Sequence, residues 1–212
     1  MAETGSPRRI GLLGGSFDPV HQAHRQLGDV ALSQLALDEL RWVVAGQPWQ
    51  KQGRRLAAPE HRAAMVELAI ADDPRHRLER CELDRVGPSY TLDTVRTLQA
   101  AEPQSAQWFL VIGQDQYTNF HTWHGWRELL ACVTLAVAAR PGQTAPPHES
   151  LAITPHRLQR LDMPERDVSA TEIRKRLAAG FSARSLAPSM LAPAVAEYID
   201  RRRLYHPSPA PT

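Results

Sequence analysis

Apolar residues in this chain form short continuous runs that alternate with longer stretches of helical spacing. Five short runs predict strands, and several of them are almost continuously apolar, which is typical of parallel strands covered by helices on both faces. They span residues 9–13, 40–45, 77–83, 107–112 and 133–139. Four stretches between them have apolar positions three or four residues apart and predict helices at 22–35, 59–70, 91–101 and 125–131.

This alternation predicts an α/β protein with a Rossmann-like, doubly wound parallel sheet, followed by C-terminal helices. Ligands of such sheets bind at the carboxyl ends of the strands. Segments 14–24, 46–51 and 113–126 each follow a strand, so we expect them to share one rim. The Pro/Gly-rich segment 141–155 predicts a loop.

Composition and charge agree with this fold class and limit the number of domains and the kinds of partner. A chain of 212 residues with 42% hydrophobic content fits one domain, 1–212, with flexible ends at 1–6 and 206–212. The net charge of +2 gives no case for a nucleic-acid or membrane surface. Without a long apolar run, we expect a cytoplasmic protein, with Cys81 and Cys132 as buried thiols in strand-like contexts rather than a disulfide.

The first candidate site is the segment G-G-S-F-D-P-V-H-Q-A-H, residues 14–24, directly after the first predicted strand. Gly14 and Gly15 lack a Cβ, so their backbone N–H groups can approach an anion closely. His21 and His24 are three residues apart at the start of a predicted helix and would share one face. A plain turn and a histidine metal pair are the alternatives, but no Cys or acidic partner has zinc spacing.

A second candidate site is V-S-A-T-E-I-R-K-R-L, residues 168–177. Ser169 and Glu172 have the spacing of a capping box, and Gly180 stands where the helix should stop. An anion at this helix start would meet Ser169, Thr171 and Arg174. Helix capping alone is the alternative.

Both segments together resemble the two motifs of the nucleotidylyltransferase superfamily, G-x-F-x-P-x-H-x-x-H and I-S-S/A-T-x-I-R. Ala23 replaces the glycine that is usual between the histidines. The resemblance implies transfer of a nucleoside monophosphate from an NTP to a phosphate, with Mg²⁺ on the phosphates and no metal held by protein side chains alone. It implies that ATP is bound by Gly14, Gly15, Ser16, Phe17, His21, His24, Asp115, Ser169, Thr171 and Arg174.

Three further segments, 87–94, 112–123 and 138–142, are similar to bacterial nicotinate-nucleotide adenylyltransferases, a likeness that covers nearly the whole chain. This family joins the AMP of ATP to nicotinate mononucleotide, giving deamido-NAD and pyrophosphate in NAD biosynthesis. The resemblance implies that the acceptor nucleotide is bound by Tyr90, Thr91, Trp123, His124 and Arg140. Asp115 would lie near the ATP ribose or the metal-bound phosphate.

One segment departs from the family pattern. Residues 46–51 read G-Q-P-W-Q-K where the family often has Pro-Pro-His-Lys/Arg, so Gln50 stands in place of a histidine. Lys51 keeps the cation. We therefore expect His21, His24, Arg174 and Lys51 to carry the reaction by electrostatic stabilisation.

Other functions stay open from the sequence. A sister enzyme could use nicotinamide mononucleotide or pantetheine phosphate as acceptor, or be a cytidylyltransferase. A non-catalytic nucleotide-binding regulator is a second class, disfavoured by the intact His21, His24 and Arg174. A dinucleotide-dependent oxidoreductase is disfavoured because the chain has no G-x-G-x-x-G. The oligomeric state, including a homo-oligomer, is left open.

Overall fold

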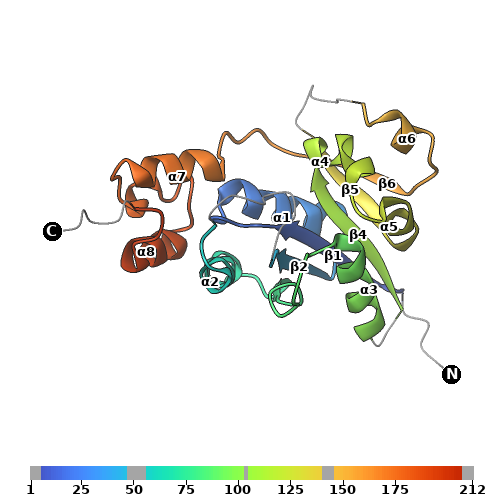
Figure 1. The fold of residues 1–212 in the computed structure, drawn as a ribbon, viewed down its shortest axis with the longest axis horizontal. Helices are drawn as coiled ribbons and strands as arrows, with labels where there is room; N and C mark the ends of the chain where they lie inside the picture. Colours follow the sequence, from blue (N-terminus) through green and yellow to red (C-terminus); the bar gives the residue numbers. More distant parts are fainter. Residues whose placement is uncertain (1–5, 47–55, 103–104, 140–145, 207–212) are drawn as a thin grey trace.

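A single parallel sheet forms the centre of the computed structural model, which describes residues 6–46, 56–102, 105–139 and 146–206. The sheet has six strands in the order β3-β2-β1-β4-β5-β6 (Figure 1). The strands are β1 Arg8–Gly15, β2 Glu39–Val44, β3 His76–Glu79, β4 Ala106–Gly113, β5 Thr134–Ala139 and β6 Leu158–Asp162. The direction of winding changes between β1 and β4, so a crevice opens at the carboxyl ends of these two strands. The predicted doubly wound fold is confirmed.

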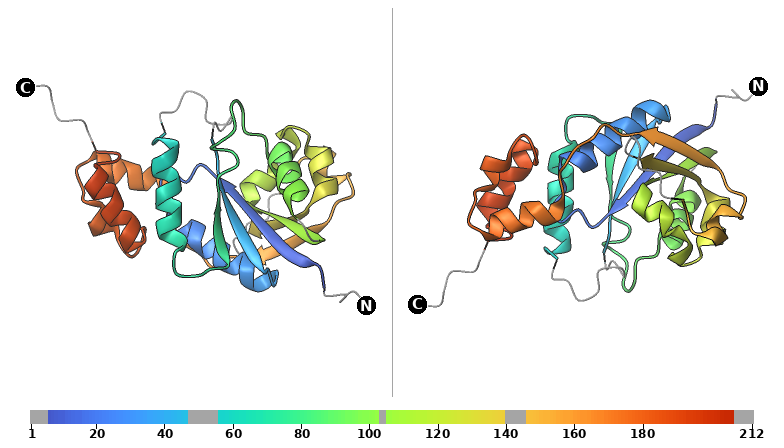
Figure 2. Two further views of the ribbon diagram at one scale, coloured as in Figure 1. Left: turned by 90° about the horizontal axis from the view of Figure 1, so that it is seen from below. Right: turned by 90° about the horizontal axis from the view of Figure 1, so that it is seen from above.

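Helices cover both faces of the sheet. Figure 2 shows α1 and α2 on one face with α7 and α8 beyond them, and α3, α4 and α5 on the other. The α-helices are α1 Gln22–Gln34, α2 Pro59–Ile70, α3 Thr91–Ala101, α4 Gln114–Thr118, α5 Trp126–Cys132, α6 Glu149–Ala152, α7 Ala170–Ala178 and α8 Pro193–Arg202. Two 3₁₀ turns, η2 Phe120–Thr122 and η3 Ala183–Leu186, complete the described elements.

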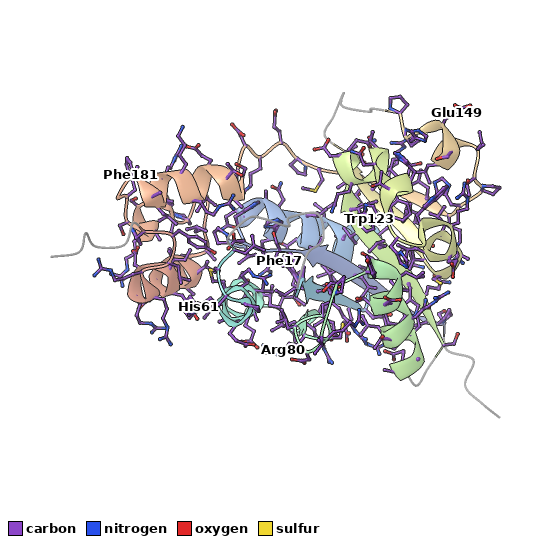
Figure 3. All side chains as sticks on the ribbon, viewed as in Figure 1. Phe17, His61, Arg80, Trp123, Glu149 and Phe181 are labelled. Carbon is purple, nitrogen blue, oxygen red and sulfur yellow. The ribbon has the colours of Figure 1, made fainter. Side chains whose placement is uncertain are left out.

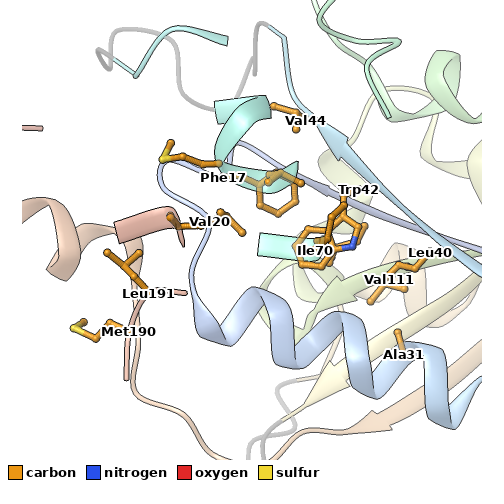
Figure 4. Packing of buried hydrophobic residues seen from close by; sticks show 14 of the residues in the cluster. Phe17, Val20, Ala31, Leu40, Trp42, Val44, Ile70, Val111, Met190 and Leu191 are labelled. Atoms are coloured by element: carbon orange, nitrogen blue, oxygen red, sulfur yellow. The ribbon is translucent and has the colours of Figure 1, made fainter. Parts of the chain in front are cut away.

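The core divides into two clusters, one on each face of the sheet. Side chains alternate along β1, so Leu13 joins the cluster under α1, α2, α7 and α8, while Leu12 joins the cluster under α3 and α5. In the first cluster Phe17 packs against Trp42, with ring centroids 5.4 Å apart. Figure 4 shows Val20 of the same loop beside Leu191. The loop after β1 is therefore packed against the C-terminal segment.

Four details differ from the sequence prediction. β3 ends at Glu79, not at residue 83, because the Glu79 carboxylate accepts the N–H of Cys81 at 2.9 Å and the chain then turns. β6 was not predicted because it is an edge strand that buries only Leu161. The rim segment 113–126 contains α4 and η2, for which no helix was predicted, and the predicted loop 141–155 contains α6. Such short elements have no helical period long enough to detect.

The prediction for the two cysteines needs a correction, whereas the predicted flexible ends lie mostly outside the described residues. Cys81 and Cys132 are free, half-buried thiols, but Cys81 lies in the turn after β3 and Cys132 ends α5, so neither is in a strand. Of the ends expected to be flexible, only Ser6 and His206 belong to the described residues. Within the described ranges, no helix is long and apolar enough to cross a bilayer.

Candidate active site

The glycine turn after β1 is held from behind by a buried aromatic ring. Phe17 is 1% exposed and has a φ of +46°, a conformation that costs a non-glycine residue energy and is sustained by its surroundings. A Cβ on Gly15 would lie 2.9 Å from the Phe17 ring, so only glycine fits there. The packed ring therefore fixes the backbone of residues 14–16 at the sheet crevice.

The two histidines form a stacked pair at the start of α1. Their ring centroids lie 3.7 Å apart, with an interplanar angle of 23°. The backbone N–H of His21 donates to Nδ1 of His24 over 3.3 Å. Because Nδ1 accepts, the hydrogen of the His24 ring is on Nε2. His24 can therefore donate a hydrogen bond from Nε2 to an anionic ligand.

His21 is the buried member of the pair. His21 is only 9% exposed, and this burial lowers the pKa of its imidazole to about 4. The ring is therefore neutral at pH 7, which avoids repulsion between two stacked cations. Its Nδ1 is buried and has no hydrogen-bond partner among the described residues.

The second motif meets the first across 156 positions of sequence. Ser169 is the N-cap of α7, as predicted, and its Oγ accepts the N–H of Glu172 at 3.2 Å. Arg174 donates from Nη1 to the backbone carbonyl of Asp18 at 2.6 Å, and from Nη2 to Thr171 Oγ1 at 3.3 Å. The guanidinium of the far end of the chain therefore lies at the glycine turn.

A cavity of about 340 Å³ opens beside the turn and extends to the ends of β2 and β4. Six of the predicted site residues line it: Gly14, Gly15, Ser16, His24, Thr91 and Trp123. Figure 3 labels Phe17 on the α1 side and Trp123 beside α4. The cavity therefore joins the phosphate-type turn to the predicted ring-binding residues.

Tyr90 and His124 stand next to these lining residues. Their rings stack with centroids 4.3 Å apart, which ties the start of α3 to the segment before α5. Trp123 packs on Phe120, with centroids 5.0 Å apart. The aromatic residues predicted for the acceptor are therefore held in two ring pairs, Tyr90 with His124 and Trp123 with Phe120.

The other predicted site residues that the structure describes do not line this cavity: Phe17, His21, Tyr90, Asp115, His124, Ser169, Thr171 and Arg174. Asp115 is exposed in the first turn of α4 and does not line the cavity. Lys51 and Arg140 lie outside the described residues.

Sequence reasoning missed three polar lining residues, Glu82, Ser89 and Gln116. Glu82 is buried, and burial raises the pKa of its carboxyl group. Thr94 donates to its Oε1 at 2.7 Å. The sequence signal that could have identified Glu82 is an acidic residue inside a stretch predicted to be a strand.

Arg62 is a buried cation behind the turn that sequence reasoning also missed. It is 1% exposed and donates to the carbonyl oxygens of Ser16, Ala45 and Ala57 at 2.9, 2.7 and 3.0 Å. Burial lowers the pKa of its guanidinium. Arg62 ties the loops after β1 and β2 together from the protein side.

The donor set fits a phosphate better than a bare metal ion. Among the residues that the structure describes, no group of three or more His, Cys, Asp or Glu side chains could hold a metal. The carboxylate of the turn itself, that of Asp18, is 2% exposed and already accepts hydrogen bonds from Tyr205 and Ala57. Backbone amides, an imidazole N–H and a guanidinium are donors that suit phosphate oxygens.

A doubly wound sheet with such a turn, paired histidines and an arginine at its switch point defines a nucleotide-binding α/β enzyme. The model of the cytidylyltransferase-like family matches residues 12–176. A probable nicotinate-nucleotide adenylyltransferase of Methylibium petroleiphilum is 56% identical, over 94% of this chain and 93% of its own. Another protein of that name, from Bordetella pertussis, is 46% identical over 93% and 98%. The chain belongs to the cytidylyltransferase-like family and, within it, to the nicotinate-nucleotide adenylyltransferases.

Solved structures agree on the fold. Plasmodium falciparum nicotinic acid mononucleotide adenylyltransferase, in its complex with NaAD, superimposes with a TM-score of 0.76. The two sequences are 20% identical, and the match covers 93% of this chain and 97% of the other. The family expected from the sequence is confirmed.

Proposed function

We propose that this enzyme transfers AMP from ATP to nicotinate mononucleotide, giving deamido-NAD and pyrophosphate in NAD biosynthesis. The observation that carries the proposal is the contact of Arg174 with Asp18, which joins the second motif to the first, whose residues Gly14, Gly15 and His24 line the cavity. The names of relatives up to 56% identical over most of the chain support the same reaction.

The ATP phosphates lie along the turn at residues 14–17 and the start of α7. The acceptor phosphate oxygen forms a bond to the α-phosphorus of ATP. The bond from that phosphorus to the bridging oxygen breaks, and its electron pair leaves with pyrophosphate. His24 Nε2–H and the turn amides hold phosphate oxygens as charge develops, while His21 supports the His24 ring. No protein nucleophile is needed.

Charge on the triphosphate is offset by two kinds of group. Arg174, with Ser169 and Thr171 at the start of α7, faces the departing pyrophosphate, and Lys51 is proposed to assist. Mg²⁺ would be held by the phosphate oxygens themselves and would neutralise part of their charge. Asp115 is proposed to lie near the ATP ribose or this metal-bound phosphate.

The acceptor ring lies at the other end of the cavity. The indole of Trp123 faces a pyridinium, an aromatic cation that an electron-rich ring attracts. The Thr91 hydroxyl and the first N–H groups of α3 receive the nicotinate carboxylate. Tyr90 and His124 stack on each other next to these residues, and Arg140 is proposed to meet the anionic groups of the substrate.

The proposed reaction indicates where the enzyme acts and which molecules it binds. We place the enzyme in the cytoplasm, with ATP and nicotinate mononucleotide as its partners. Neither nucleic acid nor a membrane takes part, and a homo-oligomer is compatible with this chemistry.

The deciding experiment measures pyrophosphate release from ATP and Mg²⁺ with each acceptor in turn. Nicotinate mononucleotide is expected to give the highest kcat/KM, above nicotinamide mononucleotide and pantetheine phosphate. CTP in place of ATP is the matched control for the transferred nucleotide. A higher kcat/KM with another acceptor would reassign the substrate, and no turnover with any acceptor would favour a nucleotide-binding regulator.

A further inference from the structure

Asp18 is a buried carboxylate at which four segments of the chain meet. It is 2% exposed and lies in the turn between β1 and α1. Its Oδ1 accepts the N–H of Ala57 at 3.0 Å and the hydroxyl of Tyr205 at 2.8 Å. Arg174 contacts the same residue from α7. The first loop, the approach to α2, the second motif and the C-terminal segment are therefore joined at one residue.

Tyr205 reaches Asp18 from 187 positions away because the chain turns back after α8. Arg203 and Tyr205 have φ values of +53° and +66°, and the N–H of Leu204 donates to the carbonyl of Ile199 at 3.1 Å. The Tyr205 ring is half-buried and packs against the core under α1 and α2. Burial raises the pKa of its hydroxyl, which therefore stays a hydrogen-bond donor.

Arg174 makes its short contact with the backbone of Asp18 and not with the carboxylate. Its Nη1 lies 2.6 Å from the Asp18 carbonyl oxygen but 3.8 Å from the carboxylate Oδ2. Arginine and carboxylate prefer a bidentate pair with two short hydrogen bonds. That pair requires both carboxylate oxygens, and Oδ1 is already held by Tyr205 and Ala57.

We propose that Tyr205 is a positioning residue for ATP, which acts by keeping the Asp18 carboxylate from capturing Arg174. With Oδ1 occupied, the guanidinium rests on a backbone carbonyl and keeps donors for phosphate oxygens. Without the Tyr205 hydroxyl, the carboxylate turns toward Arg174, forms the bidentate pair and competes with the nucleotide. This inference rests on the ATP-binding role of Arg174 in the proposed function.

The test compares Tyr205→Phe with Tyr198→Phe. Tyr198 is the matched control. Its hydroxyl also takes part in a half-buried hydrogen bond, with His61 Nδ1 at 2.8 Å, and that partner is not Asp18. Tyr205→Phe is expected to raise the KM for ATP about tenfold, the scale of one hydrogen bond to a charged group. kcat and the KM for nicotinate mononucleotide should change by less than about twofold, and Tyr198→Phe should leave all three unchanged.

A second variant separates positioning from simple loss of packing. Asp18→Asn keeps the size of the side chain and removes the charge that would compete for Arg174. Adding it to Tyr205→Phe should restore the KM for ATP to near the wild-type value, whereas lost packing would not be restored. Asp18→Asn alone should bind ATP at least as tightly as wild type, which tests the idea even if Tyr205→Phe does not fold.

Calorimetry with an ATP analogue whose α,β bridge cannot be cleaved keeps this inference separate from the proposed function. Weaker binding to Tyr205→Phe than to wild type supports the positioning role even where no acceptor is turned over. Equal affinity of the two proteins for the analogue, or no restoration by Asp18→Asn, overturns it.

Discussion

The two ends of the proposed active site, the phosphate end and the acceptor end, are built in different ways. At the phosphate end, residues 14–24 with Arg174, the groups are buried or hydrogen-bonded: Phe17 packs in the core and Arg174 is held by Asp18. At the acceptor end, formed by Tyr90, Thr91, Trp123 and His124, half-buried and exposed rings mainly stack on one another.

This difference follows from what each end must recognise. Stabilising charge in a transition state requires donors at fixed positions, so a small displacement is costly. A flat aromatic cation can be bound by any well-placed ring face, so stacking suffices. The phosphate end should therefore be sensitive to single substitutions in turnover, and the acceptor end in affinity.

The largest expected effect is the loss of turnover in His24→Ala. Removal of one preorganised donor lowers kcat by about 10²–10³. Pyrophosphate release under saturating substrates measures kcat, and thermal unfolding checks that the fold persists. His61→Ala, which removes an imidazole that does not line the cavity, is the control and should keep kcat. Near-full turnover of His24→Ala would remove His24 from the mechanism.

The buried His21 predicts a loss of stability in acid. Its pKa is about 4 in the folded protein against 6.5 for the free side chain, so below pH 6.5 the unfolded state binds the proton more readily. The stabilisation that the neutral His21 adds to the free energy of unfolding is nearly complete at pH 7. It falls by about 2 kcal/mol on going to pH 5.

Urea unfolding at pH 7 and pH 5 measures this loss. His21→Asn should lose less stability than wild type between the two values, by the same amount. Burial also lowers the pKa of His76, which stays in both proteins, so the difference between them isolates His21. Equal losses in the two proteins would show that His21 titrates normally.

The smallest expected effect is at the acceptor end. Trp123→Ala should weaken binding of nicotinate mononucleotide about 3–30-fold, the range of a cation–π contact, with less than a twofold change for ATP. Calorimetry with each nucleotide measures both affinities, and Trp123→Phe should keep part of the effect. Equal losses for the two nucleotides would contradict a stacking role and make the two ends alike.

Much of the local structure could be predicted because neighbouring residues determine it. The bounds of α2 and α3 agree with the prediction, since apolar spacing and a proline or threonine at the start mark them. The Ser169 cap and the stop near Gly180, which has a φ of +92°, agree as well. β6 was missed because an edge strand needs only one apolar face.

The partners of each site residue could not be predicted in this way. Arg62 has no motif around it, yet it binds carbonyls of two loops. Glu82 lines the cavity only because β3 ends early and the following turn brings it under α3.

By itself, the sequence determined the alternation of strands and helices, the glycine turn, the spacing of His21 and His24, and the family. Each is encoded within a few neighbouring residues, where backbone geometry and apolar periodicity act. Only the tertiary structure decided that Arg174 and Tyr205 both reach Asp18, across 156 and 187 positions. Such contacts arise when the two cores are packed, because burial of a carboxylate requires partners from whichever segments lie next to it.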